Sequence, residues 1–189
     1  MKNIASITLK LFVITIVAAA LLGLVYSVTK EPIAQQVEKA ATEARLAAFP
    51  EAKNFEDTKA EIPDEYSIIK SAYSALDSGG NVIGVVFGIT TKGFNSGLNI
   101  TVGIGADGTI KGVIIGDNNE TQGIGKKAAD PEFRDQFIDK PYDSPLKVVK
   151  AASGDYDIQA ITGATVTSKA VTNAVNTAVE FYKQLGGAK

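Results

Sequence analysis

The 189-residue sequence contains no cysteine, no histidine and no tryptophan, and its single methionine is Met1. The lack of cysteine excludes iron–sulfur clusters, thiolate zinc sites, disulfides and lipid attachment through a thiol. The lack of histidine removes the usual haem and copper ligands and any histidine-based catalytic triad. A redox role would therefore need an organic cofactor, and we expect neither a metal site nor a stand-alone catalytic set.

The sequence also lacks a large excess of either positive or negative charge. Nineteen basic and 21 acidic residues give a net charge of −2, and the two signs are mixed along the chain. Nucleic-acid binding needs a basic patch or stripe for the phosphate backbone, so we expect no nucleic-acid partner. The length corresponds to roughly one domain.

The most conspicuous feature is an uncharged apolar run over residues 11–29, between Lys10 and Lys30. As a helix this run spans about 28 Å, close to the roughly 30 Å of a bilayer hydrocarbon core. Ala18–Ala20 faintly resembles a signal-peptide cleavage site, but the apolar run continues to Val28, beyond the roughly 7–15 residues of the hydrophobic region in an ordinary signal peptide. The length therefore favours a retained transmembrane anchor embedded in the lipid bilayer.

The orientation of the predicted transmembrane helix follows from the charges on either side of it. Lys2 and Lys10 precede the run, whereas Lys30 and Glu31 offset each other just after it. Because positive flanks stay in the cytoplasm, we predict a single-pass cell-membrane protein with a cytoplasmic N-terminus and an extracytoplasmic remainder.

The chain then divides into four predicted parts. They are a cytoplasmic N-terminus (1–10), a transmembrane helix (11–29), a stalk helix with a connector (30–65) and a folded domain (66–189). Pro32 suits the first turn of a new helix, so we expect the stalk helix to begin at Lys30–Pro32. Residues 51–65 are polar and are expected to be irregular.

The folded domain has the pattern of an antiparallel meander with flanking helices, which makes it an α+β domain. Leu98, Ile100, Val102 and Ile104 alternate on one face of a strand, so helices should cover that face. The expected strands cover residues 66–76, 82–91, 98–104, 109–115, 147–150 and 157–161. The expected helices cover residues 131–137 and 166–185.

The candidate functional motif is Ile161-Thr-Gly-Ala-Thr-Val-Thr-Ser168, between a short strand and the last helix. It brings hydroxyl groups and unpaired backbone N–H groups to a helix N-terminus, which suits a phosphate dianion. Gly163 permits a sharp turn, and Thr165 would be held where its hydroxyl can reach phosphorus. From spacing alone, an ordinary helix cap built from threonine and serine is the alternative.

The residues Thr162-Gly-Ala-Thr-Val-Thr-Ser168 resemble the [Ser/Thr]-Gly-Ala-Thr signature of FMN-binding domains that carry covalent flavin. The resemblance implies that Thr165 is joined to FMN by a phosphoester, which a flavin transferase makes from FAD with magnesium. It implies that the flavin contacts include Thr162, Gly163, Ala164, Val166, Thr167 and Ser168.

A second segment, Glu120-Thr-Gln-Gly-Ile-Gly125, resembles the family's Glu-Thr-Pro-Gly-Leu-Gly, which lies near the flavin. The resemblance implies contacts from Glu120, Thr121, Gly123, Ile124 and Gly125. The family often has an acidic residue three positions before its signature. Here Gln159 stands at that position, with Asp157 two residues earlier. Phe94 would either stack on the flavin or fill the core.

With the anchor and total size, the chain is similar to the G subunits of Rnf ion-translocating oxidoreductases. The resemblance implies an electron-transfer protein with one covalent FMN, in a membrane complex that couples electron transfer between ferredoxin and NAD to Na⁺ or H⁺ translocation. Its partners would be the other membrane and peripheral Rnf subunits. The alternatives are the equivalent C subunits of Na⁺-translocating NADH:quinone reductases and a non-redox membrane anchor.

Overall fold

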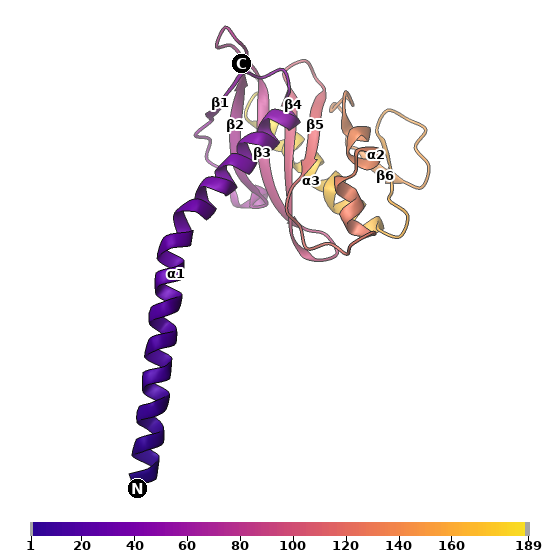
Figure 1. Ribbon diagram of the computed structural model, residues 1–189. Helices are drawn as coiled ribbons and strands as arrows, with labels where there is room; N and C mark the ends of the chain where they lie inside the picture. Colours follow the sequence, from indigo (N-terminus) through magenta and orange to yellow (C-terminus); the bar gives the residue numbers. More distant parts are fainter. Residues whose placement is uncertain (1, 188–189) are drawn as a thin grey trace. The chain divides into compact units, whose positions relative to one another are not determined.

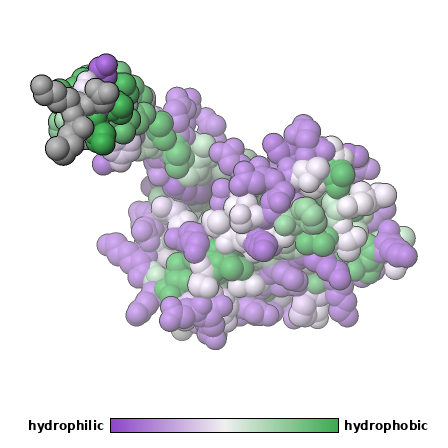
Figure 2. Space-filling model, turned by 90° about the horizontal axis from the view of Figure 1, so that it is seen from below, coloured by the Kyte–Doolittle hydropathy of each residue, from purple (hydrophilic) through white to green (hydrophobic). Residues whose placement is uncertain are grey.

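The computed structural model describes residues 2–187, which divide between Thr42 and Glu43 into two compact units. The first residue of the predicted cytoplasmic segment and the last two of the predicted domain lie outside the described residues. Helix α1 (Lys2–Ala48) contains the apolar run, and its N-terminal part is strongly hydrophobic (Figure 2). Within residues 2–187 it is the one helix long and apolar enough to cross a membrane.

The expectation of a new helix at Lys30–Pro32 is wrong, because α1 continues through Pro32 without interruption. An interior proline removes one backbone hydrogen bond and costs about 3 kcal/mol, but its fixed φ remains compatible with a helix. The freed carbonyl is that of Val28, at the end of the apolar run, where water can satisfy it. The strong helix formers Ala34, Gln35 and Gln36 follow the proline and carry the helix onward.

Five antiparallel strands form one sheet in the spatial order β1-β2-β3-β4-β5, and β2 to β5 are the meander predicted from the sequence (Figure 1). The strands are β1 (Asn54–Asp57), β2 (Ile69–Leu76), β3 (Val82–Lys92), β4 (Ser96–Gly105) and β5 (Ile110–Ile115). Alternating side chains point to opposite faces of this sheet, so each face carries its own set of buried residues.

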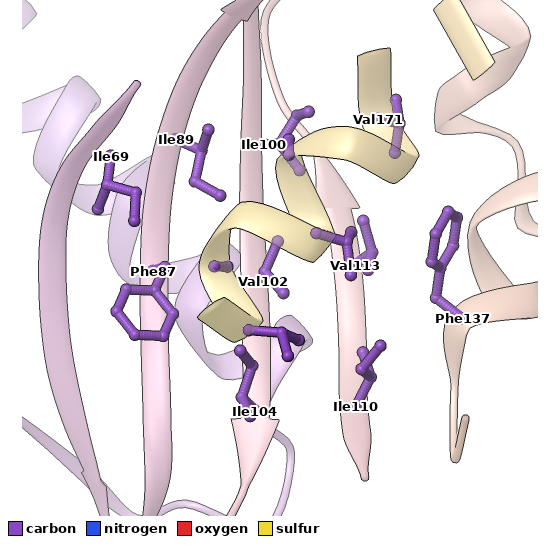
Figure 3. Packing of buried hydrophobic residues seen from close by; sticks show 14 of the residues in the cluster. Ile69, Phe87, Ile89, Ile100, Val102, Ile104, Ile110, Val113, Phe137 and Val171 are labelled. Atoms are coloured by element: carbon purple, nitrogen blue, oxygen red, sulfur yellow. The ribbon is translucent and has the colours of Figure 1, made fainter. Parts of the chain in front are cut away.

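One face packs against α3 (Thr165–Gln184), as the alternation along β4 predicted. Phe87, Ile100 and Val102 of the sheet and Val171 of α3 belong to one buried cluster, and Phe137 lies on the side beyond β5 (Figure 3). All five residues are at most 2 % exposed. This core fixes the position of α3, and therefore the position of its N-terminus.

The opposite face is covered by the last residues of α1. Gly103 and Gly112 are paired across β4 and β5, and a Cβ at either position would press on the backbone of Ala48. Phe49, fully buried, lies against Gly84 in the same way. The glycines thus form a shallow cradle in which Ala48 and Phe49 sit directly on the sheet.

Smaller elements complete the domain. They are the 3₁₀ helices η1 (Asp64–Tyr66), η2 (Gly125–Ala129) and η3 (Asp135–Phe137), helix α2 (Pro131–Arg134), and strands β6 (Lys147–Val149) and β7 (Asp157–Gln159). Strands β6 and β7 form a separate parallel pair. Residues 51–65, expected to be irregular, contain β1 and the first two residues of η1, and residues 66–68 precede β2 rather than begin it.

Candidate cofactor-binding site

A tight turn sets the start of α3. The Ala164 amide donates to the Ile161 carbonyl at 2.9 Å, and Gly163 within this turn has φ +80°. A side chain at that φ would crowd its own backbone, so the turn requires glycine. Helix α3 begins at Thr165, directly after the turn.

Ser168 locks the turn onto the helix. Its hydroxyl accepts a hydrogen bond from the Ile161 amide at 3.0 Å and donates one to the Ala164 carbonyl at 3.0 Å. The side chain is fully buried. The predicted flavin contact Ser168 therefore lies behind the turn, where it holds the helix start in shape.

The first turn of α3 presents free donors to the surface. In the described part of the chain, no protein group accepts a hydrogen bond from the amides of Thr165, Val166 or Thr167, or pairs with the Thr165 hydroxyl. Thr165 and Val166 are exposed. Unpaired amides at the positive end of a 20-residue helix form a suitable site for a phosphate group.

A cleft of about 360 Å³ opens beside these donors. Its volume falls within the range of about 300–1,000 Å³ that is usual for cofactor pockets. Three hydrophobic side chains on its rim are unusually exposed for a folded domain: Phe94 at 67 %, Val166 at 54 % and Ile124 at 44 %. An apolar, planar ring system would cover them. The cleft is lined by Phe94, Glu120, Thr121, Ile124, Gly125, Gly163, Ala164, Thr165, Val166 and Thr167.

Glu120 lies in the wall of the cleft and is only 4 % exposed. One carboxylate oxygen, Oε1, accepts the Asn95 amide at 2.9 Å, and the other, Oε2, accepts the Thr167 hydroxyl at 2.6 Å. Both side-chain oxygens are therefore used within the protein. Thr167, buried and bonded to Glu120, keeps its hydroxyl away from the cleft but its amide free.

Two loops that are distant in sequence meet here. We call residues 93–95 the Phe94 loop and residues 116–124 the Glu120 loop. The Asn95 side chain donates to the Asn119 carbonyl at 2.7 Å, and the Asn119 side chain donates to the Ser96 carbonyl at 3.1 Å. These amide side chains cross-link the loops, so the rim around Phe94 has a defined geometry.

The structure brings together most, but not all, of the predicted site residues. Thr165, the other cleft residues of the signature and four residues of the Glu120 segment line one cleft. Three lie off it: Gly123 is exposed, Ser168 is buried behind the turn and Thr162 lines a second cleft. The core alternative for Phe94 is wrong, since its ring is exposed on the cleft rim.

The second cleft, of about 480 Å³, lies on the other side of the Ile161–Ala164 turn and is more polar. Gln159 lines it, with its backbone amide bonded to the Gln136 side chain at 2.7 Å. Asp157 is instead held in its own turn, where it accepts the amides of Ser153 and Gly154. The Ser153 amide is the main cause that lowers the pKa of Asp157.

Comparison with known proteins gives a consistent family. The FMN-binding domain family matches residues 93–180, which include both sides of the cleft. The chain is 37 % identical to the G subunit of the Na⁺-translocating ferredoxin:NAD⁺ oxidoreductase complex of Acetobacterium woodii, over 97 % of this chain and 94 % of that one. It is 33 % identical to the G subunit of the ion-translocating oxidoreductase complex of Methanosarcina acetivorans, over 98 % of each chain.

Solved structures support the same fold. The crystal structure of NqrC from Shewanella oneidensis is similar with a TM-score of 0.56 and 26 % identity, over 74 % of this chain and 73 % of that one. That of the C subunit of Na⁺-translocating NADH-quinone reductase from Parabacteroides distasonis has a TM-score of 0.51 over 60 % of each chain. The agreement over nearly the full length decides the assignment: the chain belongs to the family of G subunits of ion-translocating oxidoreductase complexes, and its C-terminal part is an FMN-binding domain.

Proposed function

We propose that the chain is the electron-transferring G subunit of a membrane complex that couples ferredoxin/NAD⁺ electron transfer to Na⁺ or H⁺ translocation. We further propose that it carries one FMN, joined through its phosphate to the Thr165 hydroxyl. One observation carries this proposal most directly. The exposed Thr165 hydroxyl stands beside three free amides at the start of α3 and opens onto a cleft with an apolar rim.

The residues of the cleft fit FMN in two respects. The amides of Thr165, Val166 and Thr167 would hold the phosphate at the positive end of α3. Phe94 and Ile124, with Val166, would lie against the apolar faces of the ring system and exclude water. When bound, FMN supplies the redox chemistry, since it can exchange electrons singly or in pairs.

The covalent bond balances as a phosphoryl transfer. The oxygen of the Thr165 hydroxyl forms a bond to the FMN phosphorus of FAD, the bond to the adenylate oxygen breaks, and AMP leaves. The hydroxyl proton passes to a base of the flavin transferase, the partner implied during maturation. The exposure of Thr165 supports this route, because a separate enzyme must reach its oxygen.

Helix α1 would anchor the protein in the membrane and pack against the other membrane and peripheral subunits of the complex. It carries no acidic or basic residue between Lys10 and Lys30, which suits an anchor better than an ion path. The charge balance around the apolar run supports a cytoplasmic N-terminus and an extracytoplasmic FMN domain.

The second candidate is the equivalent C subunit of a Na⁺-translocating NADH:quinone reductase, which the structural similarity to NqrC favours. The identity of 37 % and 33 % to G subunits, over nearly the full length of the chain, outweighs this structural similarity. Co-purification decides between them: the chain should be isolated from its own host with partners that oxidise reduced ferredoxin rather than reduce quinone.

The covalent site can be tested by intact mass spectrometry and in-gel flavin fluorescence on denatured full-length chain, co-expressed with the transferase. The wild type should carry the mass of one FMN less one water, and Thr165→Ser should retain some label. Thr165→Ala should be unlabelled, whereas Thr177→Ala, which changes a threonine farther along the same helix, should be fully labelled. A labelled Thr165→Ala chain would refute the ester at Thr165. An unlabelled wild type from its own host would refute covalent flavin altogether and favour the non-redox anchor.

A further inference from the structure

Glu120 is the one charged side chain among the residues that line the apolar-rimmed cleft. Within residues 2–187 it forms no salt bridge. A buried carboxylate without a cation partner is costly unless hydrogen bonds replace its hydration. The backbone amide of Asn95 and the Thr167 hydroxyl supply them, each at a different carboxylate oxygen.

These two bonds join the three segments that form the cleft. Asn95 belongs to the Phe94 loop, Thr167 to the first turn of α3, and Glu120 itself to the Glu120 loop. Two glycines enclose the carboxylate closely: a Cβ would lie 2.6 Å from Oε1 at Gly93 and 2.5 Å from Oε2 at Gly125. The charge is therefore fixed in place, and it cannot swing toward solvent without opening the site.

The bonding pattern also leaves the phosphate donors untouched. Glu120 accepts the hydroxyl of Thr167 rather than its amide, so the amides at the α3 N-terminus stay free. The nearest lysines in sequence, Lys126 and Lys127, are exposed and solvated. Their charges are screened by water, whereas that of Glu120 acts through the protein interior.

We propose that Glu120 is a positioning residue of the flavin site, whose buried carboxylate ties the three cleft segments together and lowers the reduction potential of the bound flavin. This inference rests on the proposed function. Reduction adds electrons to a ring system beside a fixed negative charge, and this repulsion disfavours the reduced form.

Two substitutions separate the effect of the hydrogen bonds made by Glu120 from the effect of its negative charge. In Glu120→Gln the amide oxygen can still accept the Asn95 N–H, and the amide nitrogen can donate to the Thr167 oxygen, so the shape is kept and the charge is lost. Glu120→Ala removes both. The matched control is Glu132→Gln, which makes the same charge change at an exposed residue outside the apolar-rimmed cleft.

The tie is tested by amide hydrogen exchange on full-length chain in detergent. We expect the Asn95 amide to exchange roughly ten- to a hundredfold faster in Glu120→Ala, the factor for losing a hydrogen bond to a charged group. It should be nearly unchanged in Glu120→Gln and Glu132→Gln. Unchanged exchange of the Asn95 amide in Glu120→Ala would refute the proposal that Glu120 holds the three cleft segments together. This measurement is made with flavin-free Thr165→Ala chains as well, so it stands even if the ester at Thr165 does not exist.

The charge is tested by spectroelectrochemical titration of flavin-loaded chain. The midpoint potential of Glu120→Gln should rise above that of the wild type, whereas Glu132→Gln should match the wild type. An unchanged or lower potential in loaded Glu120→Gln would overturn the electrostatic role. Failure of Glu120→Gln to load would also count against the proposal, since its amide keeps both hydrogen bonds. A flavin-free wild type would instead refute the proposed function.

Discussion

Gly103→Ala should destabilise the domain, because the tightest contacts of the new methyl group are with backbone atoms. Gly103 faces Gly112 across the β4–β5 pair, on the side of the sheet where the last residues of α1 lie. Its Cβ would overlap the Ala48 carbonyl oxygen, stand 3.0 Å from the carbonyl carbon and 3.4 Å from the Phe49 ring. No side-chain rotation can relieve an overlap with a carbonyl group.

Two estimates bound the loss in the free energy of unfolding that Gly103→Ala causes. Overpacking a well-packed site costs about 1–3 kcal/mol. If the strain exceeds this, Ala48 and Phe49 can lift off the sheet instead, and the loss is then limited by the value of the buried Phe49 ring, about 3–5 kcal/mol on the scale of Phe→Ala substitutions. We therefore expect Gly103→Ala to lower the free energy of unfolding by about 2–4 kcal/mol.

The assay is urea unfolding of the full-length chain in detergent, followed by tyrosine fluorescence. The sequence has no tryptophan, and the buried Tyr66 and Tyr182 report on the domain core rather than on α1. Gly116→Ala is the matched control, because its Cβ would meet only ordinary contacts at 3.7 Å. It should change the free energy of unfolding by less than about 1 kcal/mol.

A double-mutant cycle tests the cause. If Gly103→Ala acts by displacing Ala48 and Phe49, then Phe49→Ala should cost much less in the Gly103→Ala background than in the wild type. Full additivity of the two changes, or a Gly103→Ala chain as stable as Gly116→Ala, would refute the reasoning.

Three further outcomes are expected. Gly163→Ala should strain the turn by about 1–2 kcal/mol, because φ +80° disfavours an L side chain, and should reduce flavin labelling of the denatured chain. Ser168→Ala should cost about 1–3 kcal/mol in urea unfolding, since the Ile161 amide loses its acceptor; a cost like that of an exposed serine would contradict this. The pKa of Asp157 is lowered by the Ser153 amide, so its contribution to stability is present above the unfolded pKa near 4 and is lost as pH falls through the folded value. Asp157→Asn should therefore flatten the loss of stability measured from about pH 6 to about pH 3, and an unaltered pH profile would count against that role.

The meander and the long last helix could be predicted because their signals are local. Alternating hydrophobic residues and the glycine-containing turns specify β2 to β5, and the buried stripe of α3 recurs at helical spacing. Strand β1 gives no such signal. Its sequence, Asn54-Phe-Glu-Asp57, is polar and mostly exposed, and it is a strand because the edge of β2 offers it backbone partners.

The candidate site likewise has one part that local sequence predicts and another part that depends on long-range packing. The start of α3 is set within residues 161–168, so its turn, its free amides and the exposure of Thr165 follow from a short stretch of sequence. The bond between Glu120 and Thr167 joins residues 47 positions apart, and no spacing rule predicts it. Resemblance placed Glu120 near the flavin, but only the packing of the two loops gives it the role of a buried tie.

The openness of the cleft fits the proposed chemistry of attachment. Its lining residues include one charged side chain, Glu120, and no basic one, so non-covalent contacts alone would hold the FMN phosphate only through neutral amides and hydroxyls. An electron relay also needs an accessible edge of the flavin ring, because a deeply enclosed ring would be shielded from the redox partners. This need limits how much of the ring the cleft can bury. The proposed ester at Thr165 would resolve the conflict, since it would hold FMN regardless of how much of the ring is buried. The cleft would then set the orientation and the potential of the flavin rather than its affinity.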